Sequence, residues 1–316
     1  MTPEELRVRL RWGLVPAVPV PRRLDGTLHE AAQEDYVAWM AAQPIAGVAV
    51  WVHTGRGLLL SPEMRRDVLR SWRVGIGPDR SIVAGAGARP TDPNYVASAV
   101  RMAEEAAEGG ADALLCFAPT PYRAEPHHVL AYHRALARVG LPLLLFFLYE
   151  AAGGVTYSED VLRELLSLPE VAGIKMATLD SVMTYQNVAR LIRDEFPDTL
   201  LITGEDRFLG YSMLAGAQGA LIGMGAALPS AQAALVGSPP VDNPAEFLRL
   251  TRAVDRYAQA TFRAPMEGYI QRMLWSLADT GVLPEDATHD PDGPTLEAWE
   301  REAVRRETRL FARTMP

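Results

Sequence analysis

The stretch Val171-Ala172-Gly173-Ile174-Lys175-Met176-Ala177 is a short apolar run that contains the only lysine of the 316-residue sequence. Lysine and arginine together number 31, so the other 30 are arginine. Arginine stays charged in any protein environment, whereas a buried lysine can lose its proton and attack a carbonyl to form a Schiff base. We therefore predict that Lys175 is a Schiff-base lysine. The alternative is a lysine that forms an ion pair with a buried acid.

This run is one of eight short apolar runs that we interpret as β-strands. Their near-continuous hydrophobicity is typical of parallel strands covered on both faces. Helical patterns lie between them, with four candidate N-caps: Ser61 and Asp92, which precede prolines, and Ser158 and Asp180. The expected strands span residues 13–18, 47–52, 81–85, 112–117, 142–149, 171–176, 199–203 and 219–223.

Eight βα units in series favour a closed (β/α)8 TIM barrel over an open sheet, and no glycine-rich dinucleotide loop follows the first strand. We expect the barrel in residues 1–236. Residues 237–316 are then a C-terminal helical extension packed on the barrel. Its linker ends at the helix start Asn243-Pro244. The expected helices are roughly 244–262, 266–280 and 295–314, with a loop from Pro284 to Pro294.

Composition excludes several classes of partner. The formal charge of −8 and the pI near 5.4 argue against a nucleic-acid or anionic-membrane surface, because binding phosphates requires concentrated positive charge. No run approaches the roughly 20 apolar residues of a membrane span, and the start of the chain lacks a signal sequence, so we expect a cytoplasmic protein. Cys116 is the only cysteine, and we expect a buried strand thiol.

In such a barrel, chemistry gathers at the C-terminal ends of the strands. Lys175 falls near the end of the sixth expected strand and Tyr149 at the end of the fifth. Adjacent strands lie about 4.8 Å apart, so the phenol can reach the lysine nitrogen and relay protons. The alternative is a rim tyrosine that caps the core.

The second expected strand ends in His53-Thr54-Gly55-Arg56-Gly57. A hydroxyl followed by glycines exposes backbone N–H groups that can hold a carboxylate, and Arg56 can add a bidentate contact. We predict that Thr54, Gly55 and Arg56 bind substrate. The alternative is a tight turn with a solvated arginine.

The chain resembles the dihydrodipicolinate synthase/N-acetylneuraminate lyase family of class I aldolase barrels. The resemblance covers residues 1–235, whereas the C-terminal helices match in kind only. It rests on Pro16-Ala17-Val18, Asp25-Gly26, Leu60-Ser61-Pro62-Glu63, residues 109–113, Gly173-Ile174-Lys175 and Thr203-Gly204-Glu205-Asp206.

The resemblance implies a role for each matching position. Lys175 is the Schiff-base lysine, Tyr149 the proton-relay tyrosine, and Thr54 the first threonine of the family's Gly-Thr-Thr-Gly-Glu turn. Tyr122 is the relay tyrosine that members lend across a dimer interface, and the backbone carbonyl of Leu221 faces the bound keto acid. The resemblance further implies a homodimer or homotetramer.

Three departures from the family pattern point to a different second substrate. Gly55 replaces the second threonine, which binds the pyruvate carboxylate in the family. Tyr149-Glu150-Ala151-Ala152 replaces the Tyr-Asn-x-Pro signature. The loop beyond it contains no arginine, although synthases proper use one to hold the carboxylate of aspartate semialdehyde.

We therefore predict a Schiff-base-forming lyase or aldolase that acts on pyruvate or a related 2-oxo acid and requires no metal or other cofactor. The alternative is a catalytically silent, metabolite-binding or regulatory paralogue. We expect His127, His128 and His133 to be surface histidines. Glu205 and Asp206 are interpreted either as Mg²⁺ ligands or, preferably, as an acid pair at a helix N-terminus.

Overall fold

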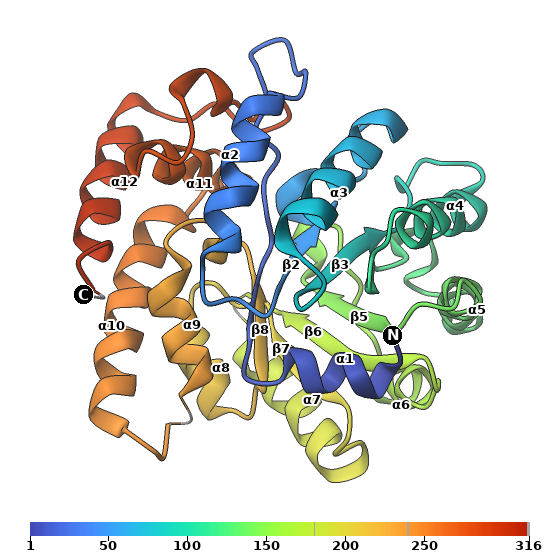
Figure 1. Ribbon diagram of the computed structural model, residues 1–316. Helices are drawn as coiled ribbons and strands as arrows, with labels where there is room; N and C mark the ends of the chain where they lie inside the picture. The colour runs from blue at the N-terminus through green and yellow to red at the C-terminus, as the bar shows by residue number, and fades with distance from the viewer. Residues whose placement is uncertain (180, 239, 315–316) are drawn as a thin grey trace.

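Eight parallel strands alternate with helices and curve into a barrel (Figure 1). The structure is a computed structural model, and it describes residues 1–179, 181–238 and 240–314. Within these ranges all eight expected strands are confirmed. They are β1 (Leu14–Pro16), β2 (Gly47–Val50), β3 (Ser81–Ala86), β4 (Ala113–Cys116), β5 (Leu143–Leu148), β6 (Val171–Ala177), β7 (Leu200–Thr203) and β8 (Gly219–Ile222).

The sheet closes between its first two strands. β1 pairs with β8, in the register Val15 to Leu221. On its other side β1 reaches β2 through a parallel bridge between Ala17 and Ala49, where the Val18 N–H donates to the Ala49 carbonyl at 3.0 Å. The strands are fully buried along their lengths, as parallel strands covered on both faces must be. The expected TIM barrel is confirmed.

An N-terminal helix, α1 (Pro3–Leu10), fills one end of the barrel. Leu6 and Leu10 are buried and belong to the same apolar cluster as the inward-facing Val15 and Leu144. A capping box at Thr2 starts the helix. The sequence reasoning did not anticipate this helix.

Helices surround the barrel: α2 (Glu30–Ala41), α3 (Pro62–Ile76), α4 (Tyr95–Glu108), α5 (Pro126–Ala137), α6 (Glu159–Leu166), α7 (Val182–Glu195), α8 (Leu209–Leu214) and α9 (Pro229–Gly237). Ser61 and Ser158 accept hydrogen bonds from N–H groups three residues later, so both expected caps are confirmed. The expected cap at Asp92 is wrong, because its carboxylate binds the Asn94 N–H and α4 begins only at Tyr95. Asp180 lies outside the described residues.

The C-terminal helical part consists of α10 (Pro244–Thr261), α11 (Tyr269–Asp279) and α12 (Ala298–Phe311), seen beside α8 and α9 in Figure 1. As expected, Asn243 caps α10, accepting from the Glu246 N–H at 3.2 Å. Tyr257 stacks on Phe311 with ring centroids 4.6 Å apart, which joins α10 to α12. The division into two domains at residue 237 stays a prediction.

Two further expectations concern individual features. Cys116 is fully buried in β4, and burial raises the pKa of its thiol, so the expected strand thiol is confirmed. Within the described ranges, no helix combines the length and the apolarity that crossing a bilayer requires.

Candidate active site

Lys175 points into the barrel from β6. Its flanking residues Ile174 and Met176 face the opposite way, into the core between strands and helices. The lysine is only 7% exposed, and its Nζ lies 4.3 Å from the ring centroid of Phe146, its register partner on β5. Gly204, just after β7, provides the space for the side chain, because a Cβ there would lie 2.5 Å from the lysine Cε.

Burial lowers the pKa of Lys175 to about 8, against the opposing charges of Asp206 and Glu205. A pKa near 8 leaves about one tenth of the amine neutral at pH 7, against about 1 in 2,500 for an unperturbed lysine. Among the described residues, Lys175 forms no ion pair within 4.0 Å. The alternative, a lysine that forms an ion pair with a buried acid, is therefore wrong.

The two carboxylates near the lysine are fixed by backbone N–H groups. Glu205 accepts from the N–H groups of Thr178 and Leu179, beyond β6, whereas Asp206 accepts from the Met224 N–H, beyond β8, at 2.7 Å. Burial raises the pKa of each carboxyl to about 7.

The preferred interpretation of Glu205 and Asp206 as a helix N-terminal pair is wrong. The next helix, α8, begins only at Leu209, and the carboxylates join β7 to its two neighbouring strand ends instead. Within the described ranges, no three His, Cys, Asp or Glu side chains converge in a way that could hold a metal ion.

A small cavity of about 60 Å³ opens at the lysine. Tyr149 lines it together with Lys175 and Phe146. The tyrosine follows β5 directly, and its N–H donates to the Ala177 carbonyl at 2.9 Å, which fixes its backbone beside the end of β6. The phenol and the amine thus share one pocket.

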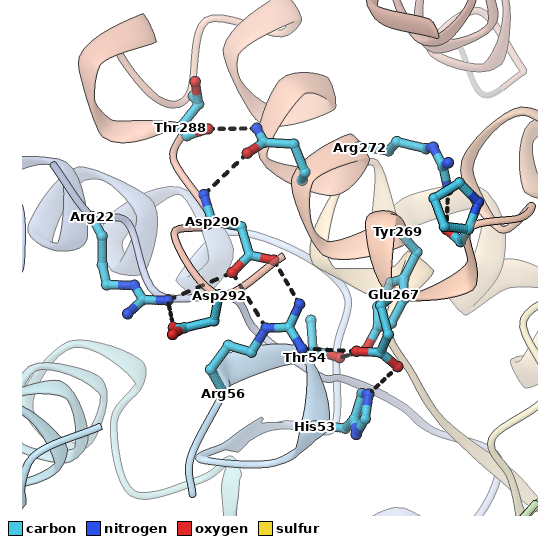
Figure 2. A network of polar contacts seen from close by, with 12 residues as sticks. Arg22, His53, Thr54, Arg56, Glu267, Tyr269, Arg272, Thr288, Asp290 and Asp292 are labelled. Atoms are coloured by element: carbon cyan, nitrogen blue, oxygen red, sulfur yellow. Dashed lines mark hydrogen bonds and ion pairs between the residues drawn. The ribbon is translucent and has the colours of Figure 1, made fainter. Parts of the chain in front are cut away.

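Thr54 lies in the same cavity, held by a residue from the C-terminal part. It is 3% exposed, and its Oγ1 lies 2.9 Å from the hydroxyl of Tyr269 (Figure 2). The Tyr269 ring stacks on Phe262 at 4.6 Å. Gly223, just after β8, makes room for this ring, since a Cβ there would lie 2.7 Å from it. The C-terminal part therefore builds one wall of the pocket.

Arg56 has a different environment from the one expected. Its Nη1 donates to Glu267 at 2.7 Å, and its Nη2 and Nε donate to Asp290 at 2.8 and 3.3 Å (Figure 2). Asp290 is buried, and Arg22 approaches the same carboxylate. The solvated-arginine alternative is wrong. The guanidinium ties the β2 turn to the C-terminal part, and Arg56 is not among the described residues that line the lysine cavity.

The dihydrodipicolinate synthetase family matches residues 11–237 of this sequence. The chain belongs to this family. Among its relatives, 4-hydroxy-tetrahydrodipicolinate synthase of Oleidesulfovibrio alaskensis is 28% identical over 195 residues, which are 61% of this chain and 63% of the relative. N-acetylneuraminate lyase of Rhizobium meliloti is 29% identical over 210 residues, 66% of either chain. The matched stretch thus spans less than two thirds of the first relative's length.

Solved structures show the same fold over nearly the whole chain. Ruminococcus gnavus sialic acid aldolase superposes with a TM-score of 0.83 at 17% identity, covering 97% of this chain and 98% of that one. Dihydrodipicolinate synthase from Oceanobacillus iheyensis superposes with a TM-score of 0.80 at 19% identity, covering 98% of each.

Three residues that the family resemblance singled out lie outside the cavity lining. Gly55 is buried in the β2 turn, and Leu221 is buried in β8 below the cavity, where Gly223 is the lining residue. Tyr122 packs on the rings of Tyr95 and His128 at 5.7 and 5.2 Å. Its role across a dimer interface stays a prediction, as does the homodimer or homotetramer itself.

Sequence reasoning missed the residues that the C-terminal part supplies, namely Phe262, Met266, Glu267 and Tyr269. They lie in or next to the irregular segment between α10 and α11, where no periodicity marks them. Asp206 also lines the cavity, and the sequence did contain a pattern that predicts this position. It follows β7 at the mouth of the barrel, where functional groups gather.

The expectation of three surface histidines is wrong for His133. It is fully buried in α5, with its Nδ1 2.8 Å from the Val129 carbonyl, and burial lowers its pKa to about 4. His128 is exposed and lies 2.7 Å from Glu125.

Proposed function

We propose that the protein is a Schiff-base lyase or aldolase that acts on pyruvate or a closely related 2-oxo acid. The observation that carries this proposal is the buried amine of Lys175 in the same cavity as the phenol of Tyr149. A nucleophilic lysine needs a neutral amine near physiological pH and a group that moves protons beside it, and this cavity offers both.

The size of the cavity supports a small oxo acid. One water needs about 10–15 Å³ on this measure of volume, so about 60 Å³ admits a group of only a few heavy atoms. Pyruvate is of that size, whereas the rest of a longer substrate must extend toward the barrel mouth.

The reaction follows from the groups present. The neutral Nζ of Lys175 attacks the C2 carbonyl. Tyr149 relays one proton from the amine to the carbonyl oxygen and then gives its own, so the oxygen leaves as water and the Tyr149 phenolate is ready to take a C3 proton. The protonated imine then draws electrons from C3, and loss of a C3 proton gives an enamine. In the synthetic direction C3 bonds to an aldehyde carbon, whose oxygen takes a proton, and water releases the 4-hydroxy-2-oxo acid. Cleavage is the reverse sequence.

We assign Thr54 and Tyr269 to the carboxylate of the oxo acid. Two hydroxyls 2.9 Å apart share one hydrogen bond, so the pair keeps one O–H free to donate into the cavity. Burial raises the pKa of Tyr269 well above its usual value, so its phenol stays protonated. This pair offsets the replacement of the family's second threonine by Gly55.

The test is borohydride reduction in the presence of pyruvate, followed by mass spectrometry of the arginine-cleaved peptides. We expect one reduced pyruvyl group on Lys175 and none on the matched variant Lys175→Arg, which keeps a long cation but cannot supply a neutral amine. Circular dichroism serves as the check that both proteins are folded. A folded protein that gives no adduct with pyruvate or other 2-oxo acids contradicts the proposal.

A second candidate is the catalytically silent paralogue that binds a metabolite. Two departures favour it: Gly55 in the β2 turn, and Glu150 beside the relay tyrosine. The exposed Glu150 accepts a hydrogen bond from Thr156 at 2.8 Å instead of facing the lysine cavity. Tight binding of a 2-oxo acid without a reducible adduct is the result that favours this candidate.

A further inference from the structure

A second cavity, of about 220 Å³, adjoins the lysine cavity at the barrel mouth. We call it the side chamber. The two cavities share His53, Leu148 and Ala152, so they meet where β2 and β5 end. A group bound covalently to Lys175 can extend into the side chamber past these residues.

The side chamber has a mostly apolar wall. Val52, Leu58 and Phe117 contribute to it from the ends of β2 and β4, and Ala88 and Pro90 come from the loop after β3. Phe117 and Ala88 are themselves buried. This surface favours alkyl or aryl groups, because burying each CH₂ removes apolar area from water.

The polar side chains around the side chamber already have partners. Tyr95 donates to the Ala118 carbonyl at 3.3 Å, and Thr120 donates to the Gly153 carbonyl at 2.6 Å. All three nitrogens of Arg56 donate to carboxylates. With these donated bonds already made, a substrate hydroxyl or carboxylate placed here exchanges water for an incomplete set of partners, whereas an alkyl or aryl group gains from the apolar wall.

We propose that the side chamber receives the apolar side chain of the second substrate, an alkyl or aryl aldehyde in the synthetic direction and the 4-substituent of a 4-hydroxy-2-oxo acid in cleavage. This inference rests on the proposed Schiff-base function. It places the reacting aldehyde carbon beside the enamine in the lysine cavity and its substituent among Val52, Leu58 and Phe117.

The first experiment compares pyruvate addition to acetaldehyde, butanal, hexanal and benzaldehyde with addition to glyceraldehyde and erythrose. We expect kcat/KM to rise about threefold to fourfold per buried methylene. Each hydroxylated aldehyde should fall at least about tenfold below the apolar one of similar length. A flat series, or a preference for the hydroxylated aldehydes, overturns the proposal.

The second experiment fills the side chamber with Ala88→Leu. We expect at least a tenfold loss of kcat/KM for hexanal, an effect of less than twofold for acetaldehyde, and unchanged borohydride trapping of pyruvate. Val74→Leu, at an exposed position on α3, is the matched control and should change none of these. If Ala88→Leu does not fold, Ala88→Ser replaces it and should lower the ratio of hexanal to glyceraldehyde activity.

The outcomes separate the two proposals. Two results overturn the side-chamber assignment and leave the Schiff-base function standing. In the first, pyruvate is trapped at Lys175 but the enzyme shows no selectivity for apolar aldehydes. In the second, the Ala88 variants do not change that selectivity. Absence of trapping in the folded wild-type protein overturns both.

Discussion

Replacing Tyr269 with phenylalanine removes one hydroxyl from the pocket wall and little else. The ring's stacking on Phe262 at 4.6 Å and on His53 at 6.3 Å does not depend on the oxygen. What disappears is the 2.9 Å hydrogen bond to Thr54 and, with Thr54 as the donor within the pair, the Tyr269 O–H that donates to the substrate. The variant therefore separates the hydroxyl's chemistry from the packing of the C-terminal part.

The expected loss follows from the type of bond. A hydrogen bond to a charged carboxylate contributes about 1.5–3 kcal/mol, which corresponds to a loss of about 10-fold to 150-fold in kcat/KM. The free energy of unfolding should fall by about 1–3 kcal/mol, because the buried Thr54 hydroxyl loses its partner. If the bond is made equally in the ground state and the transition state, the loss appears in KM and not in kcat.

The assay measures aldol addition over a range of pyruvate concentrations, with urea unfolding as a separate measure of stability. Tyr211→Phe is the matched control. It also removes a tyrosine hydroxyl that makes a 2.7 Å hydrogen bond, to Gln186 near the surface, away from the lysine cavity. A kcat/KM for Tyr269→Phe within twofold of wild type, with pyruvate trapping intact, would refute the assignment of the hydroxyl pair.

Two further predictions concern charge. Asp206→Asn keeps an oxygen to accept from the Met224 N–H but removes a negative charge that raises the pKa of Lys175, so this pKa should fall. Because the neutral amine is the reactive form, wild-type activity should rise with pH through about 8. The midpoint of the pH–rate profile of Asp206→Asn should lie at a lower pH. An unchanged or higher midpoint contradicts this account. Arg56→Met leaves Asp290 buried with only Arg22 nearby, at 3.6 Å, and should lower the free energy of unfolding by about 3–5 kcal/mol in urea titration. Arg70→Met, which removes an exposed ion pair with Asp67, should cost no more than about 1 kcal/mol, and equal losses would show that the Arg56 network is not stabilising.

Local patterns in the sequence were sufficient to predict the barrel. Each strand is a short apolar run, and a serial βα order leaves few ways to arrange eight such runs. The same order places Lys175 and Tyr149 at one end of adjacent strands, so their shared pocket follows from topology. The prediction works because the required information lies within a few residues of each position.

The contributions of the C-terminal part depend on contacts between distant residues. Arg56 and Asp290 are 234 positions apart, and Thr54 and Tyr269 are 215 apart. Nothing in the segment from Pro284 to Pro294 marks Asp290 as a buried partner, because an acidic loop residue is usually solvated. These pairings arise from the way α11 and the following loop pack over the β2 turn, which periodicity does not encode.

The wrong expectation of a surface position for His133 has a different origin, because the nearby sequence contains a pattern that predicts its burial. It lies four residues after Val129 and three before Leu136, on the buried face of α5. Helical spacing therefore predicts a core position. Histidine as a residue type suggested a surface position, but the 3.6-residue helical period correctly predicts that His133 is buried.

The burial of the lone lysine also determines how the protein responds to amine-directed reagents. Apart from the α-amino group, Lys175 is the only primary amine in the 316 residues, and it is 7% exposed. Bulky acylating dyes and crosslinkers have almost no side chain to modify, whereas a small electrophile that enters the pocket modifies one site. Once the α-amino group has been blocked, mass spectrometry of the intact protein after such labelling therefore counts labelled active sites, without an engineered tag.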